Sequence, residues 1–189
     1  DLTSEVASVG NTTAEAPVTA EADYYQDYQD GKDIALGDLT INKTVYPEAQ
    51  LLKPSELTAA IITAGGLIFV DNSDAADLSF TISGASINMG DIVLIGRYPE
   101  RAQATISGPE LRCKHNAAFK NLHIAASGNY NLFTTTNATY DPTLHVEDCT
   151  VDAAYNVVYD SHNTQNFKSV YFGNSIVKMT VANKPFYST

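Results

Sequence analysis

The chain lacks tryptophan and is poor in basic residues. Its 189 residues include 11 Lys and Arg against 22 Asp and Glu, so the formal net charge is −11. Nucleic acids and anionic membranes attract basic surfaces, and we therefore expect neither of them as a partner. No apolar run reaches the roughly 20 residues of a membrane-spanning helix, which argues against membrane insertion.

The chain is also poor in cysteine. Cys113 and Cys149 are its two cysteines, and neither belongs to a Cys-x-x-Cys or zinc-like motif. We expect two small, buried thiols, and a single disulfide stays open as the alternative. We predict no metal site and no cofactor. The acidity is explained by solubility, with a calcium requirement as the alternative.

The acidic residues gather near the N-terminus. Residues 1–40 hold nine acidic side chains and one Lys, and residues 1–22 are rich in Ser, Thr, Ala, Val and Glu with little periodicity. This composition is typical of a linker or a tether. We therefore predict an acidic N-terminal extension, partly linker, over residues 1–53 and a folded domain over residues 54–189. Asp1 is not a natural start, so we expect a processed or trimmed chain whose missing beginning could have held a secretion signal.

A short pattern recurs three times in the C-terminal half. It consists of an apolar residue, then Asn or Asp two positions later, then an apolar residue three positions after that. The copies start at Phe119, Val146 and Phe172, with spacings of 27 (146 − 119) and 26 (172 − 146) residues. A fixed period of this length indicates stacked repeats. The Val, Ile, Phe and Tyr of the copies, interrupted by Gly, Asn and Pro, favour strands over helices.

Two or three short strands per repeat describe one coil of a parallel β-helix. We therefore predict an all-β fold, a right-handed parallel β-helix of four to six coils. Strands of successive coils would pair about 4.8 Å apart, which places equivalent residues in columns. Asn121, Asp148 and Asn174 should form a column at a bend, because Asn and Asp tolerate unusual backbone angles. The inward columns are expected to be Phe119, Val146 and Phe172; Ile124, Val151 and Val177; and Leu122, Cys149 and Ser175.

A short helix is predicted directly before the first strand, over residues 54–66. Ser55 is the expected N-cap and Gly65 the expected C-terminal stop. The apolar face of this helix would consist of Leu57, Ala60, Ile61 and Ala64. A β-helix has an open end whose interior and strand edge must be covered. We therefore predict that this helix is the N-terminal cap.

Three segments carry a resemblance to a known family. The capping segment that runs into Gly65–Val70, the strand Asp91–Gly96 and the repeat Phe119–Ile124 resemble pectate-lyase-like right-handed β-helix proteins. The closest likeness is to secreted β-helix lipoproteins of unknown function from gut Bacteroidetes, and it covers residues 54–189. The resemblance implies a secreted or cell-surface, outer-membrane-tethered location and a polysaccharide or oligosaccharide as ligand.

The enzymes of that superfamily combine a Lys or Arg base with acidic calcium ligands, or use paired Asp residues for hydrolysis. No such set can be carried over to this chain residue by residue, so we name no catalytic residue. Arg112, Lys114 and His115 form a cationic patch that would suit lyase chemistry on an acidic sugar. Asp148 and Asp160 are candidate carboxylates for hydrolysis, but a structural role suffices for Asp148.

The eleven tyrosines are the better functional clue. Aromatic faces stack on the apolar faces of sugars, and the phenol adds a hydrogen-bonding group. The repeat places two of the tyrosines in register, 25 residues apart (155 − 130). The alternative is that half of the tyrosines serve packing. The candidate carbohydrate-binding residues are Tyr130, Tyr155, Tyr159, His162 and Tyr171.

We therefore predict a secreted or surface-tethered β-helix module that interacts with carbohydrate and is not catalytic. Two alternatives stay open. One is a polysaccharide lyase or hydrolase that acts on an acidic glycan. The other is a structural or adhesin spacer.

Overall fold

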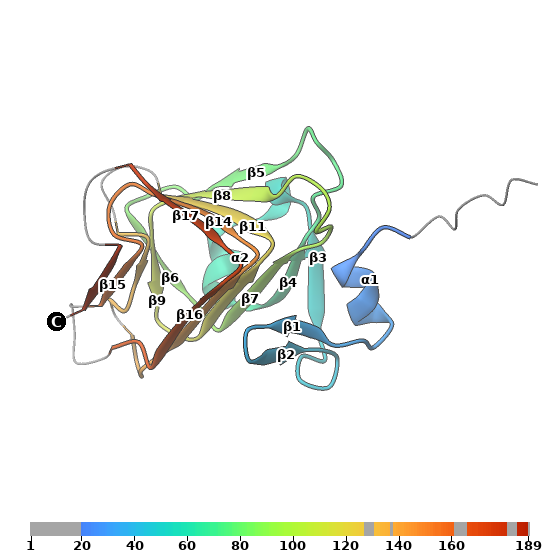
Figure 1. Ribbon diagram of the computed structural model, residues 1–189, viewed down its shortest axis with the longest axis horizontal. Coiled ribbons are helices and arrows are strands. Elements are labelled where there is room, and N and C mark those ends of the chain that lie inside the picture. The colour runs from blue at the N-terminus through green and yellow to red at the C-terminus, as the bar shows by residue number, and fades with distance from the viewer. Residues whose placement is uncertain (1–19, 127–130, 137, 161–165, 181–184, 189) are drawn as a thin grey trace, which may run out of the picture.

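The computed structural model describes residues 20–126, 131–136, 138–160, 166–180 and 185–188 (Figure 1). Within these residues the chain forms a parallel β-solenoid with two short α-helices, which confirms the predicted all-β, parallel β-helix architecture. Tyr130 and His162, two of the candidate binding residues, lie outside the described residues.

Three parallel sheets form the walls of the solenoid, and strands β4 to β18 fall into five successive triplets, one strand per sheet. The first sheet contains β3 (Ala49–Leu52), β4 (Gly66–Val70), β7 (Ile92–Gly96), β10 (Ala117–Lys120), β13 (Thr143–Glu147) and β16 (Ser169–Gly173). The second contains β5 (Ser79–Thr81), β8 (Ala104–Gly108), β11 (Leu122–Ala126), β14 (Thr150–Ala153) and β17 (Ile176–Met179). The third contains β6 (Ser86–Met89), β9 (Glu110–Cys113), β12 (Phe133–Thr134), β15 (Val158–Asp160) and β18 (Phe186–Ser188).

The columns predicted from the repeat are present in the sheet register. Phe119 pairs with Val146, and Val146 pairs with Phe172 in the next coil. The second column is confirmed in the same way, since Val151 pairs with both Ile124 and Val177. Most of these side chains are buried in one continuous core inside the solenoid.

The predicted bend column is also confirmed. Asn121, Asp148 and Asn174 have φ angles of 54°, 53° and 42°, a left-handed conformation that Asn and Asp adopt more readily than most residues. Side chains link the coils here: Asn121 Nδ2 donates to the Gly96 carbonyl at 3.0 Å, and Asn174 Nδ2 donates to Asp148 Oδ1 at 2.7 Å. The Asx residue therefore both turns the chain and joins it to the adjacent coil.

Both cysteines are free and buried, as expected, and no disulfide links them. Burial raises the pKa of the Cys113 thiol, and it raises the pKa of the Cys149 thiol to about 12. Thiols with raised pKa values and no access to solvent are unreactive, so a packing role accounts for both.

The N-terminal end of the solenoid is closed, although the helix differs from the prediction. A 3₁₀ turn, η1 (Pro54–Glu56), precedes the α-helix α2 (Ala59–Ala64), whose N-cap is Thr58, with Oγ1 accepting from Ile61 N at 3.2 Å. The Ser55 N-cap was wrong because the Ser55 hydroxyl pairs with Asp77 instead.

The buried face of this cap is also shorter than predicted. Leu57 and Ile62 join the solenoid core and Ile61 is half-buried, whereas Ala60 and Ala64 are exposed. The helix begins after Leu57, so its buried positions shift. The stop at Gly65 is as predicted, with φ of 78°, and the cap covers the core as expected.

Residues 20–52, assigned above to the extension, fold against the outer face of the first sheet. They form α1 (Tyr24–Gln29), the antiparallel hairpin β1 (Ile34–Leu36) and β2 (Leu39–Ile41), and β3, which pairs with β4. A second apolar cluster forms between the hairpin and the sheet, and it contains Tyr28, Ile34, Leu36, Ile41, Leu67, Phe69, Val93, Ile95 and Ala118. Strands buried on both faces are continuously apolar, which explains the sequences of β4 and β7.

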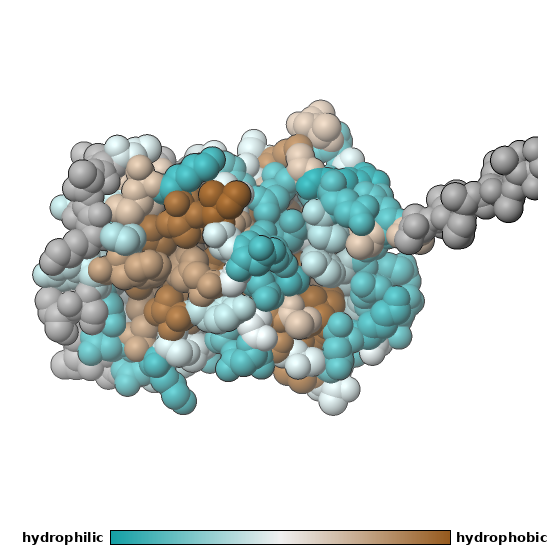
Figure 2. Space-filling model, viewed as in Figure 1, coloured by the Kyte–Doolittle hydropathy of each residue, from teal (hydrophilic) through white to brown (hydrophobic). Residues whose placement is uncertain are grey.

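The opposite end of the solenoid is uncovered in the described residues. Ile176, Val177 and Phe186, from the last strand triplet, are exposed. Figure 2 shows a brown, hydrophobic area over β16 and β17.

Candidate functional site

A pocket of ≈ 270 Å³ lies between the N-terminal segment and the outer face of the first sheet. Its floor includes Ala118, which pairs with Val93 on one side and His145 on the other. Because alanine is the smallest side chain of this row, the sheet is hollowed at β10. The lining also includes Leu39, Tyr46, Asp91, Asn116 and Thr143.

The N-terminal segment supplies one wall of this pocket. Leu39 begins β2, and Tyr46 follows the hairpin. The position of Tyr46 is fixed by its backbone, because its N–H donates to Asn42 O at 2.8 Å and its carbonyl accepts from the buried Tyr28 hydroxyl at 2.8 Å. The aromatic wall is therefore tied to the cluster that attaches the hairpin to the solenoid.

The opposite wall is a ladder of polar groups where the chain enters the first sheet. Asp91 Oδ1 accepts from the Asn116 N–H and from the Tyr140 hydroxyl, each at 3.0 Å, and Asn116 Oδ1 accepts from the Thr143 N–H at 2.9 Å. The ring of Tyr140 packs against His115, with centroids 5.5 Å apart. Three successive coils thus present carboxylate, amide and phenol groups side by side.

The two tyrosines beside Asp91 stay protonated in neutral water. Burial raises the pKa of Tyr46, and the nearby Asp91 carboxylate adds to the effect. Burial also raises the pKa of Tyr140, and its hydrogen bond to Asp91 contributes in the same direction. The Tyr46 hydroxyl makes no hydrogen bond with the described residues, so it is a donor that a ligand can use.

A second polar group on the same face surrounds Lys120. Its Nζ lies 2.6 Å from Asp148 Oδ2 and 2.9 Å from Glu147 Oε2, and its side chain is 8% exposed. Burial alone would lower the pKa of Lys120, but the hydrogen bonds to Asp148 and Glu147 outweigh it and raise the pKa. This lysine is a fixed cation rather than a proton acceptor.

The tip of the hairpin is held on the sheet beside this group. His145 Nε2 lies 2.5 Å from Asp38 Oδ1, and Gly37 N donates to Glu147 Oε2 at 3.2 Å. Hydrogen bonding to His145 holds the pKa of Asp38 below its usual range. Gly37 has φ of 61°, and an added Cβ would meet the His145 ring at 2.9 Å. The tip therefore requires glycine.

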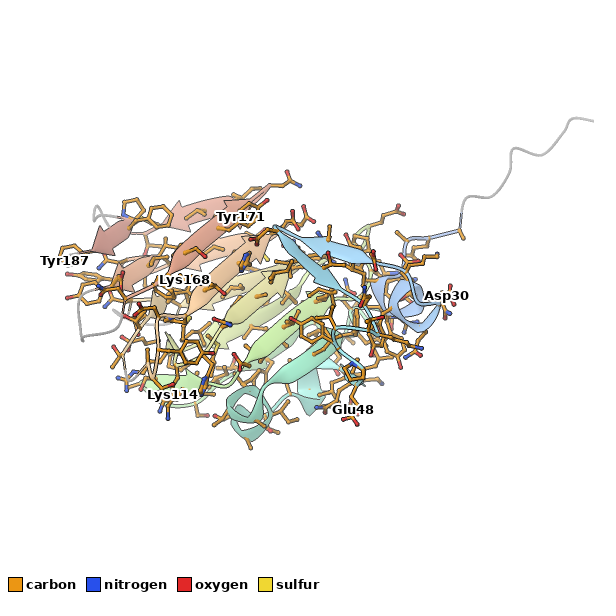
Figure 3. The ribbon with its side chains drawn as sticks, turned by 90° about the horizontal axis from the view of Figure 1, so that it is seen from below. Asp30, Glu48, Lys114, Lys168, Tyr171 and Tyr187 are labelled. Carbon is orange, nitrogen blue, oxygen red and sulfur yellow. The ribbon has the colours of Figure 1, made fainter. Side chains whose placement is uncertain are left out.

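The described candidate tyrosines do not all lie on one sheet. Tyr159 is on β15 of the third sheet, where its ring stacks on Tyr187 at 5.0 Å, and Tyr171 is on β16 of the first sheet. Figure 3 shows Tyr171 near the hairpin tip and Tyr187 at the other end of the last coil. Tyr155 is 43% exposed and precedes β15.

The pocket residues were not selected from the sequence, although part of the signal was there. Three of the pocket residues recur with the period of the repeat, but at another corner of the coil. They are Asp91, Asn116 and Thr143, separated by 25 (116 − 91) and 27 (143 − 116) residues. No pattern in the sequence indicates that Tyr46, in the extension, returns to this corner.

Three of the candidate catalytic groups, Arg112, Asp148 and Asp160, are engaged in structural contacts. Arg112 Nε donates to Glu110 Oε1 at 2.8 Å. Asp160 is buried and accepts from the Thr135 hydroxyl at 3.0 Å. Within the described part of the chain, no group of three or more His, Cys, Asp or Glu side chains could hold a metal ion. No helix among these residues is long and apolar enough to span a membrane.

Comparisons with known proteins gave no match to a family model, a curated protein or a solved structure.

Proposed function

We propose that the protein is a secreted or surface-tethered module that binds a polysaccharide or oligosaccharide without cleaving it. The observation that carries this proposal is the pocket between the hairpin and the first sheet, where Tyr46 and Tyr140 flank the ladder of Asp91, Asn116 and Thr143. Aromatic rings and planar polar side chains on one concave surface suit the apolar faces and hydroxyl groups of a sugar.

The size and place of the pocket agree with a short stretch of glycan. Its volume of ≈ 270 Å³ is just below the range of roughly 300–1,000 Å³ for small-molecule sites. Asp91 and Tyr140 are exposed at its margin, so a longer chain can continue along the corner of the solenoid. The resemblance to secreted pectate-lyase-like β-helix proteins supports the same ligand class and location.

A binding role accounts for the polar groups better than catalysis does. Lyase chemistry needs a base that is free to accept a proton, and Lys120 is held as a cation by two carboxylates. Hydrolysis needs two carboxyl groups at either side of a scissile bond, whereas Asp148 and Asp160 are committed to Lys120 and Thr135.

Glycan arrays, followed by isothermal titration calorimetry on the full chain, test the proposal. We expect at least one plant or host glycan to bind, and we expect Tyr140→Ala to weaken its binding about tenfold or more. Phe186→Ala, which removes an exposed aromatic ring from β18 of the third sheet, is the control and should bind normally. Absence of any binding glycan, or unchanged binding by Tyr140→Ala, would overturn the proposal and leave the spacer as the better explanation.

The enzymatic alternative has a separate test. The protein is incubated with pectins and glycosaminoglycans, with and without calcium. We expect neither unsaturated products nor new reducing ends, and the appearance of either would establish a lyase or a hydrolase.

A further inference from the structure

The lining of the pocket carries a single charge. Asp91 is the one charged side chain among the residues that line it, and no Lys or Arg is among them. The carboxylate is exposed at the margin, so it faces whatever enters. A sugar carboxylate placed here would meet a like charge.

Lys120, the cation of the neighbouring polar group on this sheet, is already paired with Glu147 and Asp148. Lys114 and His115 precede Asn116 at the same corner, but neither of them lines the pocket. Lys168 belongs to the next coil, where its N–H donates to Pro142 O, and it does not line the pocket. The net charge of −11 adds a background field of the same sign as Asp91.

The hydrogen-bonding groups fit neutral or basic sugars. Recognition of a carboxylate usually uses Arg or clustered N–H donors. The lining has no Arg, and its side-chain donors are the neutral Tyr46 hydroxyl, Thr143 hydroxyl and Asn116 amide. The acceptors are Asp91 and Asn116, whose oxygens already face the corner of the sheet. Acceptors suit hydroxyl and ammonium groups, which can donate.

We propose, on the basis of the proposed function, that the pocket binds sugars without a carboxylate, favours those that carry an amine, and rejects uronates. The preference comes from Asp91: it attracts an ammonium group, accepts from a neutral hydroxyl and repels a uronate. The ligand class is therefore neutral and amino-sugar glycans rather than pectin-like or glycosaminoglycan chains.

The experiment compares glycans that differ in charge. A glycan array first identifies the class of glycan that binds. The array contains neutral plant and host glycans, chitosan oligomers, oligogalacturonates and glycosaminoglycans. Calorimetry then compares cellotetraose, the glucosamine tetramer and the cellouronic acid tetramer, which share one β-1,4-linked backbone. We expect the amine form to bind about tenfold or more tighter than the uronate form, with a difference that shrinks as salt screens Asp91.

Two variants test whether the charge of Asp91 causes the preference for the amine form of the glycan. Asp91→Asn keeps an oxygen that can accept from Tyr140 and Asn116 but removes the charge, so the preference for the amine should fall by about threefold or more. Glu100→Gln removes one exposed negative charge outside the pocket and should leave the preference unchanged.

The outcomes separate the two proposals. If no array member binds, the proposed function and this inference both fall. If oligogalacturonates or glycosaminoglycans bind as tightly as neutral and amino-sugar glycans, the inference is overturned while carbohydrate binding stands. An amine preference that Asp91→Asn leaves intact would overturn the role of Asp91.

Discussion

Asp23 and Arg97 lie against each other although 74 residues separate them. Arg97 Nη2 is 2.7 Å from Asp23 Oδ2, and Arg97 Nε is 3.0 Å from both carboxylate oxygens. Both side chains are mostly shielded from water. The same carboxylate caps α1 by accepting from Gln26 N at 3.0 Å. One acidic side chain therefore starts the N-terminal helix and fastens it to the end of β7.

Replacement of Asp23 by Asn should weaken this attachment without removing the helix cap, because Asn also caps helices well. We expect a loss of about 1.5–3 kcal/mol in the free energy of unfolding at pH 7, the usual contribution of a hydrogen bond to a charged group. Urea denaturation measures it. Asp30→Asn, an exposed acidic residue at the end of α1, is the control and should have little effect.

The pH dependence follows from the same contact. Burial would raise the pKa of Asp23, but the Arg97 and Gln26 hydrogen bonds outweigh it and lower the pKa. A lowered pKa contributes stability that is fully present above the unfolded value of about 3.9 and is lost progressively as the pH falls through the lowered pKa of the folded state. The stability advantage of the wild type over Asp23→Asn should therefore hold between pH 7 and pH 5 and shrink below about pH 4. A stability advantage as large at about pH 2 as at pH 7 would contradict this assignment.

Lys120→Met tests the charged group below the hairpin tip. The substitution keeps the length of the side chain but leaves Glu147 and Asp148 without their shared cation. Breaking a fully buried pair costs roughly 3–5 kcal/mol. We expect about 2 kcal/mol, because both carboxylates retain some contact with water. The readout is the urea midpoint, with Lys178→Met on exposed β17 as the control. Equal midpoints for the two variants would show that Lys120 adds no net stability.

The sequence predicts the solenoid well because its signal is periodic. The positions of Asn121, Asp148 and Asn174 set the bends, and every inward residue between them follows from strand geometry. The strand register of a stacked fold repeats in each coil. The three copies of the sequence pattern therefore predict how the strands of the other coils pair.

The placement of the N-terminal segment could not be predicted in the same way. Tyr28, Ile34 and Tyr46 belong to no repeat, and their contacts with the first sheet depend on tertiary packing. The one sequence signal was the continuous apolar character of β4 and β7, whose outer faces need a cover. The candidate site was missed for this reason, since its aromatic wall comes from that segment.

The bend column gives a prediction that separates backbone strain from hydrogen bonding. Asn121 is buried, has φ of 54° and donates to the Gly96 carbonyl. Asn121→Gly loses the hydrogen bond and keeps the backbone conformation. Asn121→Ala loses the hydrogen bond and also strains the backbone, which costs roughly 1–2 kcal/mol more in this conformation. We expect alanine to be the more destabilising substitution by about 1 kcal/mol in urea denaturation. A glycine variant as unstable as the alanine variant would assign the whole effect to the lost amide.

Val151 and Val177 occupy equivalent positions in neighbouring coils. Val151 on β14 pairs with Val177 on β17, yet Val151 is 0% exposed and Val177 is 38% exposed. The two have the same side chain and the same strand position, so their difference isolates the uncovered end of the solenoid. Val151→Ala removes two methyl groups from the core and should cost about 2 kcal/mol. Val177→Ala should cost less than about 1 kcal/mol, because water already reaches its side chain. Urea denaturation of both variants at low protein concentration measures the difference. If Val177→Ala proves as costly as Val151→Ala, then the end of the solenoid is covered in solution, and repetition of the measurement at several protein concentrations would show whether a second copy of the chain covers it.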